Sequence, residues 1–118
     1  MTFLIILLSF LPLQARYRVV AAVVLAPADS SAEPLDGVRL TLHSRAGGPE
    51  FSGVSANGGR IVIEGVPPGV YDVAITELPS DSILVYALHG RRDTLKEGLE
   101  VKSDSEISIL LSHSGRIP

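Results

Sequence analysis

The 118-residue chain contains no cysteine and no tryptophan, and its 10 lysine and arginine residues are outnumbered by 13 aspartate and glutamate residues. Without cysteine, the chain has no thiol nucleophile, no cysteine-ligated zinc site and no disulfide. Its net charge of −3 argues against a nucleic-acid binder, which needs a basic face to meet the phosphates. Hydrophobic residues nevertheless make up 46% of the chain, which is enough apolar material for one folded domain.

The first 15 residues carry no charged side chain, and the apolar run from Phe3 to Leu13 is interrupted only by Ser9 and Pro12. This run has signal-peptide length and is shorter than the roughly 20 residues that a membrane-spanning helix needs. We therefore predict a signal peptide over residues 1–15, no transmembrane span, and export to the periplasm, the cell surface or the medium. Because no lysine or arginine precedes the run, two alternatives stay open: a misassigned start codon and a buried first strand.

Beyond residue 15, short apolar segments are separated by turn residues, a pattern typical of an antiparallel β-sandwich. Val38, Leu40 and Leu42, for example, alternate with polar side chains, as in a strand with one buried face. No segment has a convincing helical pattern; residues 94–97 could make one turn, which Gly98 would end. We predict about seven strands, near residues 18–25, 37–43, 50–55, 60–64, 70–76, 83–89 and 106–111, with a short extension at 99–101. The predicted core comprises Val38, Leu40, Leu42, Ile61, Ile63, Val66, Tyr71, Val73, Ile75, Ile107, Ile109 and Leu111.

Two turn motifs punctuate these strands. Asn57-Gly58-Gly59 predicts a tight hairpin, because asparagine and glycine tolerate the positive φ that such a turn demands. Pro67-Pro68-Gly69 predicts a type II turn, in which proline presets φ at the second position and glycine supplies a positive φ at the third. A β-branched residue at Gly69 should therefore be costly.

The stretch ANGGRIVIEGVPPGVYDVAI, residues 56–75, resembles the signature of the carboxypeptidase regulatory-like domains. These domains are prealbumin-like (transthyretin-like) seven-stranded sandwiches with an Ig-like Greek key, and they are grouped with a carbohydrate-binding-like fold. Residues 35–42 resemble the second strand of that family. The motif residues that carry the resemblance are Asn57, Gly58, Pro67, Pro68, Gly69 and Tyr71.

The resemblance implies an all-β, seven-stranded antiparallel sandwich over residues 16–113. Residues 89–93 and 98–101 resemble a tail seen in copies of the domain from bacterial envelope proteins. Residues 114–118 form a tail that resembles the opening of a second, truncated module.

The function that the resemblance implies is a non-catalytic structural or interaction module of an exported bacterial envelope protein, acting as a spacer or docking domain. Its expected partner is another protein or a neighbouring domain. The alternative is a carbohydrate-binding module, whose partner is a polysaccharide. Such a module needs exposed aromatic rings that stack on sugars, and the candidate ligand contacts are Tyr17 and Tyr86.

The residues do not support a peptidase. A zinc carboxypeptidase is much longer than this chain and needs a histidine and a glutamate at close spacing, plus a distant second histidine. No carboxylate lies three residues after His43, His89 or His113. A Gly-x-Ser-x-Gly elbow is absent, and the glycine pairs do not open a helix that could hold a phosphate. We expect no enzyme, no catalytic residue, no metal and no cofactor.

Two segments are more apolar than a strand with one buried face requires. In Val19–Leu25 and in Ile83–Leu88, both the odd-numbered and the even-numbered residues are apolar, so both faces of each strand would be apolar. Antiparallel sheets usually leave the outer face polar, so an apolar outer face favours packing against a partner or a neighbouring domain. The alternative, that these are central strands with small outward apolar residues, stays open.

Overall fold

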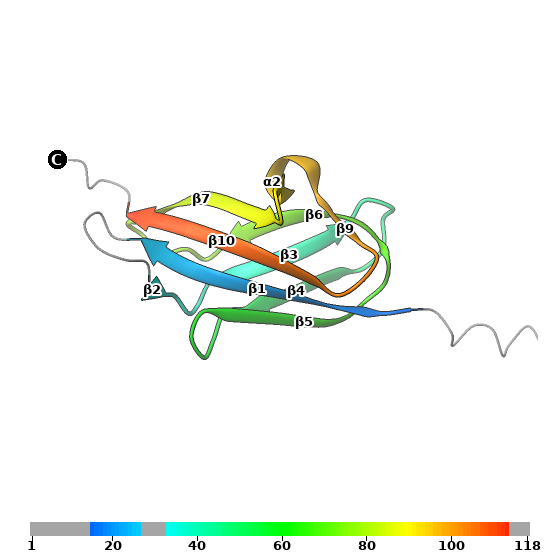
Figure 1. Ribbon diagram of the computed structural model, residues 1–118, viewed down its shortest axis with the longest axis horizontal. Coiled ribbons are helices and arrows are strands. Elements are labelled where there is room, and N and C mark those ends of the chain that lie inside the picture. Colours follow the sequence, from blue (N-terminus) through cyan, green and yellow to red (C-terminus); the bar gives the residue numbers. More distant parts are fainter. Residues whose placement is uncertain (1–14, 27–32, 114–118) are drawn as a thin grey trace, which may run out of the picture.

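The computed structural model describes residues 15–26 and 33–113, and these form a sandwich of two β-sheets (Figure 1). The all-β sandwich predicted from the sequence is confirmed. The predicted signal peptide, except for Ala15, and the tail 114–118 lie outside the described residues.

The first sheet, sheet A, has the strand order β2-β1-β10-β7-β8, with β5 pairing β1 on the same side as β2. The second sheet, sheet B, has the order β4-β3-β6-β9. The strands of sheet A are β1 (Tyr17–Ala26), β2 (Glu33–Pro34), β5 (Arg60–Val66), β7 (Ser82–His89), β8 (Arg92–Asp93) and β10 (Ser105–His113). Those of sheet B are β3 (Arg39–Ser44), β4 (Glu50–Val54), β6 (Gly69–Thr76) and β9 (Leu99–Val101). Seven of these described strands have five or more residues, near the seven predicted segments.

One strand pair departs from the predicted antiparallel sandwich. β1 and β10 pair in parallel, from Val19 opposite Ser105 to Ala26 opposite Ser112, whereas the other pairs of described strands are antiparallel. These strands come from opposite ends of the chain, and no turn between them sets their direction. Local patterning therefore carried no information about their pairing.

Residues 94–97, where the sequence pattern was too short to predict a helix, form one helical turn, α2 (Thr94–Glu97). The Asp93 side chain caps its N-terminus by accepting a hydrogen bond from the Leu95 amide over 3.0 Å. Gly98 ends it with a φ of +80° and donates its amide to the Thr94 carbonyl oxygen. The cap residues thus confine helix to one turn between β8 and β9.

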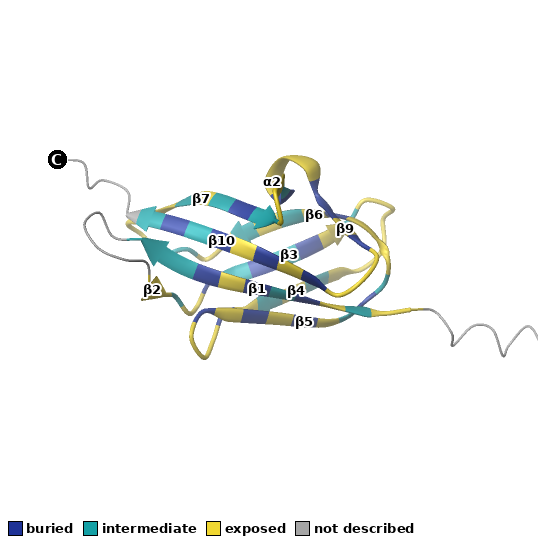
Figure 2. Ribbon diagram, in the orientation of Figure 1, coloured by how far each residue is buried: buried dark blue, intermediate teal, exposed yellow. Residues whose placement is uncertain are grey.

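The core lies between the two sheets and contains most of the predicted residues (Figure 2). Of the twelve, Val73 and Ile75 are only partly buried and the other ten are buried. The prediction missed six buried apolar residues, Val19, Ala21, Val23, Ala87, Leu99 and Val101. The first four lie on strands that are apolar at both parities, so alternation could not show which parity points inward.

The tight turn predicted at Asn57-Gly58-Gly59 forms, with φ values of +51°, +97° and +79°. It is a minimal hairpin closed by one antiparallel bridge, because the strands on either side of it, β4 and β5, lie in different sheets. Ala56 and Arg60 close it with two reciprocal backbone hydrogen bonds of 2.9 and 3.0 Å. Gly59 also donates to Asp36 Oδ1 over 2.6 Å and accepts from the Val23 amide over 2.7 Å. The hairpin is therefore anchored where β1, β2 and β5 meet.

The Pro67-Pro68-Gly69 segment connects β5 in sheet A to β6 in sheet B. Gly69 has a positive φ of +154°, which differs from the roughly +80° of the predicted type II turn. The segment is held by Tyr71, whose hydroxyl donates to the Pro67 carbonyl oxygen over 2.7 Å. This hydrogen bond gives the aromatic residue of the motif a structural role at the crossover.

Candidate docking surface

The outer face of sheet A carries apolar side chains at one end of β1, β10 and β7. The strand registers place Val24 beside Leu110 and Leu110 beside Tyr86, in one row across the three strands. A second row joins Ala26, Ser112 and Ile83, and a third joins Ala22, Ser108 and Leu88. We call the apolar members of these rows, with Val85, the apolar patch: Ala22, Val24, Ala26, Ile83, Val85, Tyr86, Leu88 and Leu110.

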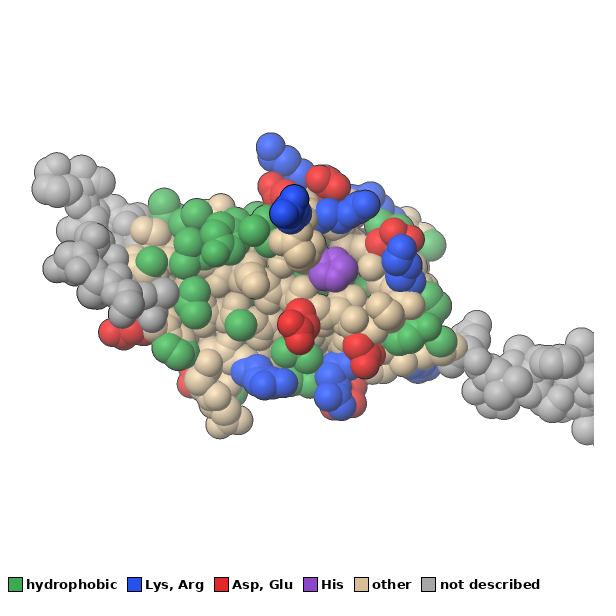
Figure 3. All heavy atoms as spheres, in the orientation of Figure 1, with side chains coloured by type: hydrophobic (Ala, Val, Ile, Leu, Met, Phe, Trp, Pro, Cys, Tyr) green, Lys and Arg blue, Asp and Glu red, His purple; other side chains and the backbone are tan. Residues whose placement is uncertain are grey.

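The patch points away from the core because its members alternate with buried residues. Val23, Ile109 and Leu111 are buried next to Val24 and Leu110. None of the patch residues belongs to the core cluster or to the side chains packed against it. In Figure 3 hydrophobic side chains gather over β7 and the adjoining ends of β10 and β1.

A β-bulge in β7 enlarges the patch. The register with β10 shifts between Leu110, opposite Tyr86, and Leu111, opposite Leu84, which leaves Val85 without an opposite residue. Leu84 packs against the core, while the exposed fractions of Ile83 and Val85 are 51% and 49%. These are the highest values among the exposed large hydrophobic residues of the described chain.

The outer face of sheet B is different, because its side chains form ion pairs. Arg39 Nε lies 2.6 Å from Glu77, and Arg45 Nε lies 2.7 Å from Asp72. His43 Nδ1 lies 3.1 Å from Glu50, directly across the β3–β4 ladder. Such a face is suited to water, and its exposed large hydrophobic residues, Val54 and Val70, lie on different strands, β4 and β6. The apolar rows that cross adjacent strands are a feature of sheet A.

A shallow hollow of about 400 Å³ borders the patch over β1, β10 and the 57–59 hairpin. Arg60 and Glu106 line it together with Ser108, and neither charged residue is in an ion pair with another described residue. The hollow thus presents one charge of each sign and a hydroxyl. The described residues that line it include no histidine and no second carboxylate that could assist acid–base chemistry.

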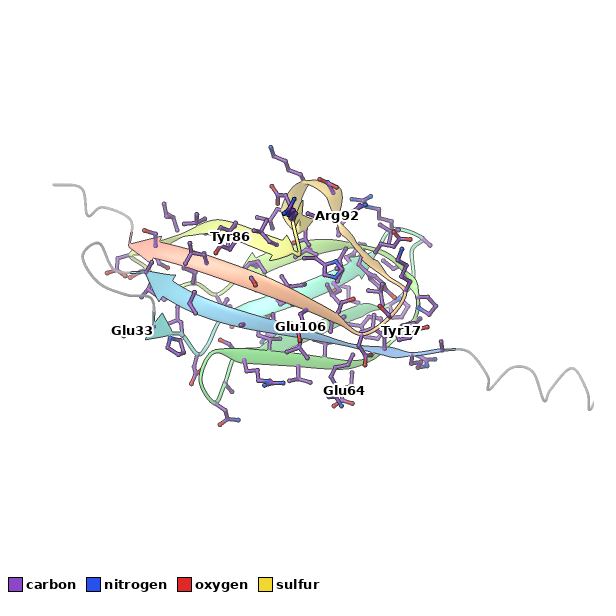
Figure 4. All side chains as sticks on the ribbon, viewed as in Figure 1. Tyr17, Glu33, Glu64, Tyr86, Arg92 and Glu106 are labelled. Atoms are coloured by element: carbon purple, nitrogen blue, oxygen red, sulfur yellow. The ribbon has the colours of Figure 1, made fainter. Side chains whose placement is uncertain are left out.

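The structure does not bring the two candidate sugar-contacting tyrosines together. Tyr86 lies in the apolar patch, opposite Leu110, which is level with Val24 of β1. Tyr17 is seven residues before Val24, or about 23 Å along the strand, and its side chain packs against the core. Figure 4 shows the two tyrosines toward opposite ends of the sandwich. They cannot form one stacking platform.

Residues 15–26 and 33–113 contain no group of three histidine, cysteine, aspartate or glutamate side chains that could hold a metal ion. Within the same ranges, no helix has the length and apolar character needed to cross a membrane.

Sequence patterning indicated the two apolar strands of this surface but not their junction. The signal for the junction was Ile109-Leu110-Leu111, three adjacent large apolar residues in a strand that otherwise alternates, with Leu110 at a position where a polar residue is expected. The parallel pairing of β1 and β10 makes Leu110 the bridge between β1 and β7. That bridge turns two separate apolar strands into one surface.

No family model and no curated protein matches the chain.

Proposed function

We propose that the chain is a non-catalytic interaction module that docks onto a partner through the apolar patch. The observation that carries the proposal is that outward apolar side chains adjoin one another across three strands of sheet A, whereas ion pairs connect outward side chains on sheet B. Burying apolar area contributes roughly 25 cal/mol per Å², and a contiguous apolar patch offers a partner such area. The resemblance to the carboxypeptidase regulatory-like domains supports the same function.

The proposal includes export as part of a bacterial envelope protein. Its support is the apolar run over residues 3–13 and the resemblance described above. In a secreting host, we expect the mature protein to begin after residue 15, which intact-mass measurement would detect. A secreted or cytoplasmic product that retains Met1 to Ala15 would contradict the signal peptide.

Photo-cross-linking tests the docking proposal directly. A photoreactive phenylalanine analogue replaces Tyr86 in the patch and, as a matched control, Val54, which is 40% exposed on sheet B. In cells that naturally produce the chain, we expect a covalent adduct from position 86 and none from position 54. Absence of any adduct at position 86, or equal adducts at both positions, would count against docking through the patch.

A carbohydrate-binding module is the second candidate, and the outward position of Tyr86 favours it. Aromatic rings on an open sheet face stack on sugars, and the neighbouring hollow offers charged and hydroxyl groups. The test is an amide NMR titration with soluble polysaccharides. Peaks that shift around Tyr86, with the affinity lost in Tyr86→Ala, would favour this candidate; unchanged affinity in the variant would remove the platform.

A further inference from the structure

We propose that the apolar patch docks onto the same patch of a second copy of this chain, about a two-fold axis that runs along β10. The inference rests on the proposed docking function and names its partner. It is carried by the distribution of side-chain size within the patch.

Side-chain size increases across the patch from β1 to β7. The outward residues of β1 are small, namely Ala22, Val24 and Ala26, and those of β7 are large, namely Leu88, Tyr86 and Ile83. β10 lies between them and contributes Ser108, Leu110 and Ser112. Each of the three rows therefore forms a ramp from a small to a large side chain.

This ramp is complementary to itself under a two-fold rotation. Rotation about an axis along β10 places β7 of one copy over β1 of the other, so that each large side chain meets a small one. Ala22 then faces Leu88, and Ala26 faces Ile83. Large and small residues at facing positions interdigitate in well-packed layers, and two sheets stack with their strands within about 30°.

The charges on sheet A set where the contact ends, because the exposed Glu106 of β10 lies on the same axis two residues before Ser108 and would face Glu106 of the second copy. None of the nine positions in the three rows is charged, so stacking the rows desolvates no unpaired charge. The contact is isologous, which closes the assembly at two copies and avoids an open chain of copies.

The size of the patch sets the expected strength. Three strands about 4.8 Å apart and five residues of about 3.3 Å each span a footprint of about 240 Å². A stable interface buries about 800 Å² per partner, so a contact of this size should give only a weak, concentration-dependent dimer. Association would thus respond to the local concentration of the chain.

The experiment is analytical ultracentrifugation of the full chain, in the processed form that the expressing cell yields, from about 10 µM to about 1 mM. We expect a reversible monomer–dimer equilibrium. Leu110→Lys places a charge on the axis and should abolish the dimer, whereas Val54→Lys on sheet B should leave it unchanged. Dispersed amide NMR spectra confirm that each variant is folded.

Two uncharged substitutions distinguish the two-fold packing from non-specific hydrophobic association. Ala22→Leu opposes two large side chains and should weaken the dimer about tenfold, and adding Leu88→Ala should restore it. Non-specific hydrophobic association would instead make the dimer of Ala22→Leu stronger, because that substitution adds apolar surface.

Three results would overturn the inference: a monomer up to about 1 mM, a dimer insensitive to Leu110→Lys, or a dimer strengthened by Ala22→Leu. The photo-cross-linking experiment at position 86 shows whether only the dimer is rejected or the docking function as well. An adduct with a different protein, from a chain that stays monomeric, rejects the second copy and retains the docking module. No adduct and no dimer reject both.

Discussion

Tyr71 connects the two sheets at the point where the chain crosses from β5 to β6. Its hydroxyl hydrogen-bonds the Pro67 carbonyl oxygen, and its ring meets that of Phe51 edge to face, with centroids 6.2 Å apart. Burial raises the pKa of Tyr71 above its ordinary value of 10.0, and the positive charge of Arg16 partly opposes this. The pH dependence of stability should therefore report on the burial of Tyr71 at the crossover.

Tyr71→Phe should lower the free energy of unfolding by about 1 kcal/mol at neutral pH, because a buried hydrogen bond is lost. The raised pKa means that the folded state keeps the phenolic proton longer than the unfolded state. The wild type should therefore lose stability as the pH rises above about 10, and the variant should lack this contribution. Urea unfolding between neutral and alkaline pH measures both effects. Tyr86→Phe, on the outer face, is the control and should be nearly neutral; equal losses in the two variants would contradict the role given to Tyr71.

Gly59→Ala should destabilise the chain more than Gly58→Ala, although both glycines have positive φ. An alanine Cβ at Gly58 meets nothing within 4 Å, so only the backbone penalty of roughly 1–2 kcal/mol applies. At Gly59 the Cβ would overlap the Val23 carbonyl oxygen and lie 2.9 Å from the Leu35 amide nitrogen. Thermal unfolding of both variants measures the difference. Equal melting temperatures would show that the 57–59 hairpin is not anchored against β1 and β2.

Within a single strand, β10 offers a buried and an outward residue side by side. Ile109→Ala should cost about 2–5 kcal/mol, since the side chain is 1% exposed and its removal leaves a cavity. Leu110→Ala should cost under about 1.5 kcal/mol, because its side chain lies outside the core. Equilibrium unfolding in urea compares them, and a reversed order would mean that the faces of β10 are assigned the wrong way round.

The elements that could be predicted from the sequence were those with local signals. Alternation located the strands of sheet B, as in Val38, Leu40 and Leu42, and the Asn57-Gly58 pair located the hairpin. The direction of β1 against β10 had no local signal, because 78 residues separate Ala26 from Ser105. The alternation of apolar and polar residues indicates which face of a strand is buried, but it does not indicate which strands pair with each other.

The apolar character of the candidate surface could be predicted from the sequence, but its shape could not. Apolar residues at both parities in 83–88 indicated a covered outer face, but the bulge at Val85 depends on the pairing of β7 with β10. Tyr17 was predicted as an exposed ligand contact, but it packs against the core. It alternates in step with Val19, Ala21 and Val23, and only the structure shows that these residues of β1 point inward.

For the whole molecule, the fold depends on its last strand. β10 lies between β1 and β7 in sheet A and supplies three buried core residues, Ile107, Ile109 and Leu111. A chain ending at Asp104 should therefore fail to fold, whereas a chain ending at His113 should fold. Amide NMR dispersion distinguishes the outcomes. A folded chain ending at Asp104 would show that sheet B is stable without the centre of sheet A.

The parallel pairing of β1 and β10 also determines how the module would carry tension. Tyr17 and His113 lie at opposite ends of the sandwich, since the two strands run side by side in the same direction (Figure 1). A force pulling these ends apart acts along both strands and loads their eight register pairs in shear. The hydrogen bonds of a parallel ladder are evenly spaced, so they share the load and would break together, whereas an antiparallel hairpin pulled at its open end unzips bond by bond. The same pairing that makes Leu110 a bridge thus makes the sandwich a mechanically resistant link.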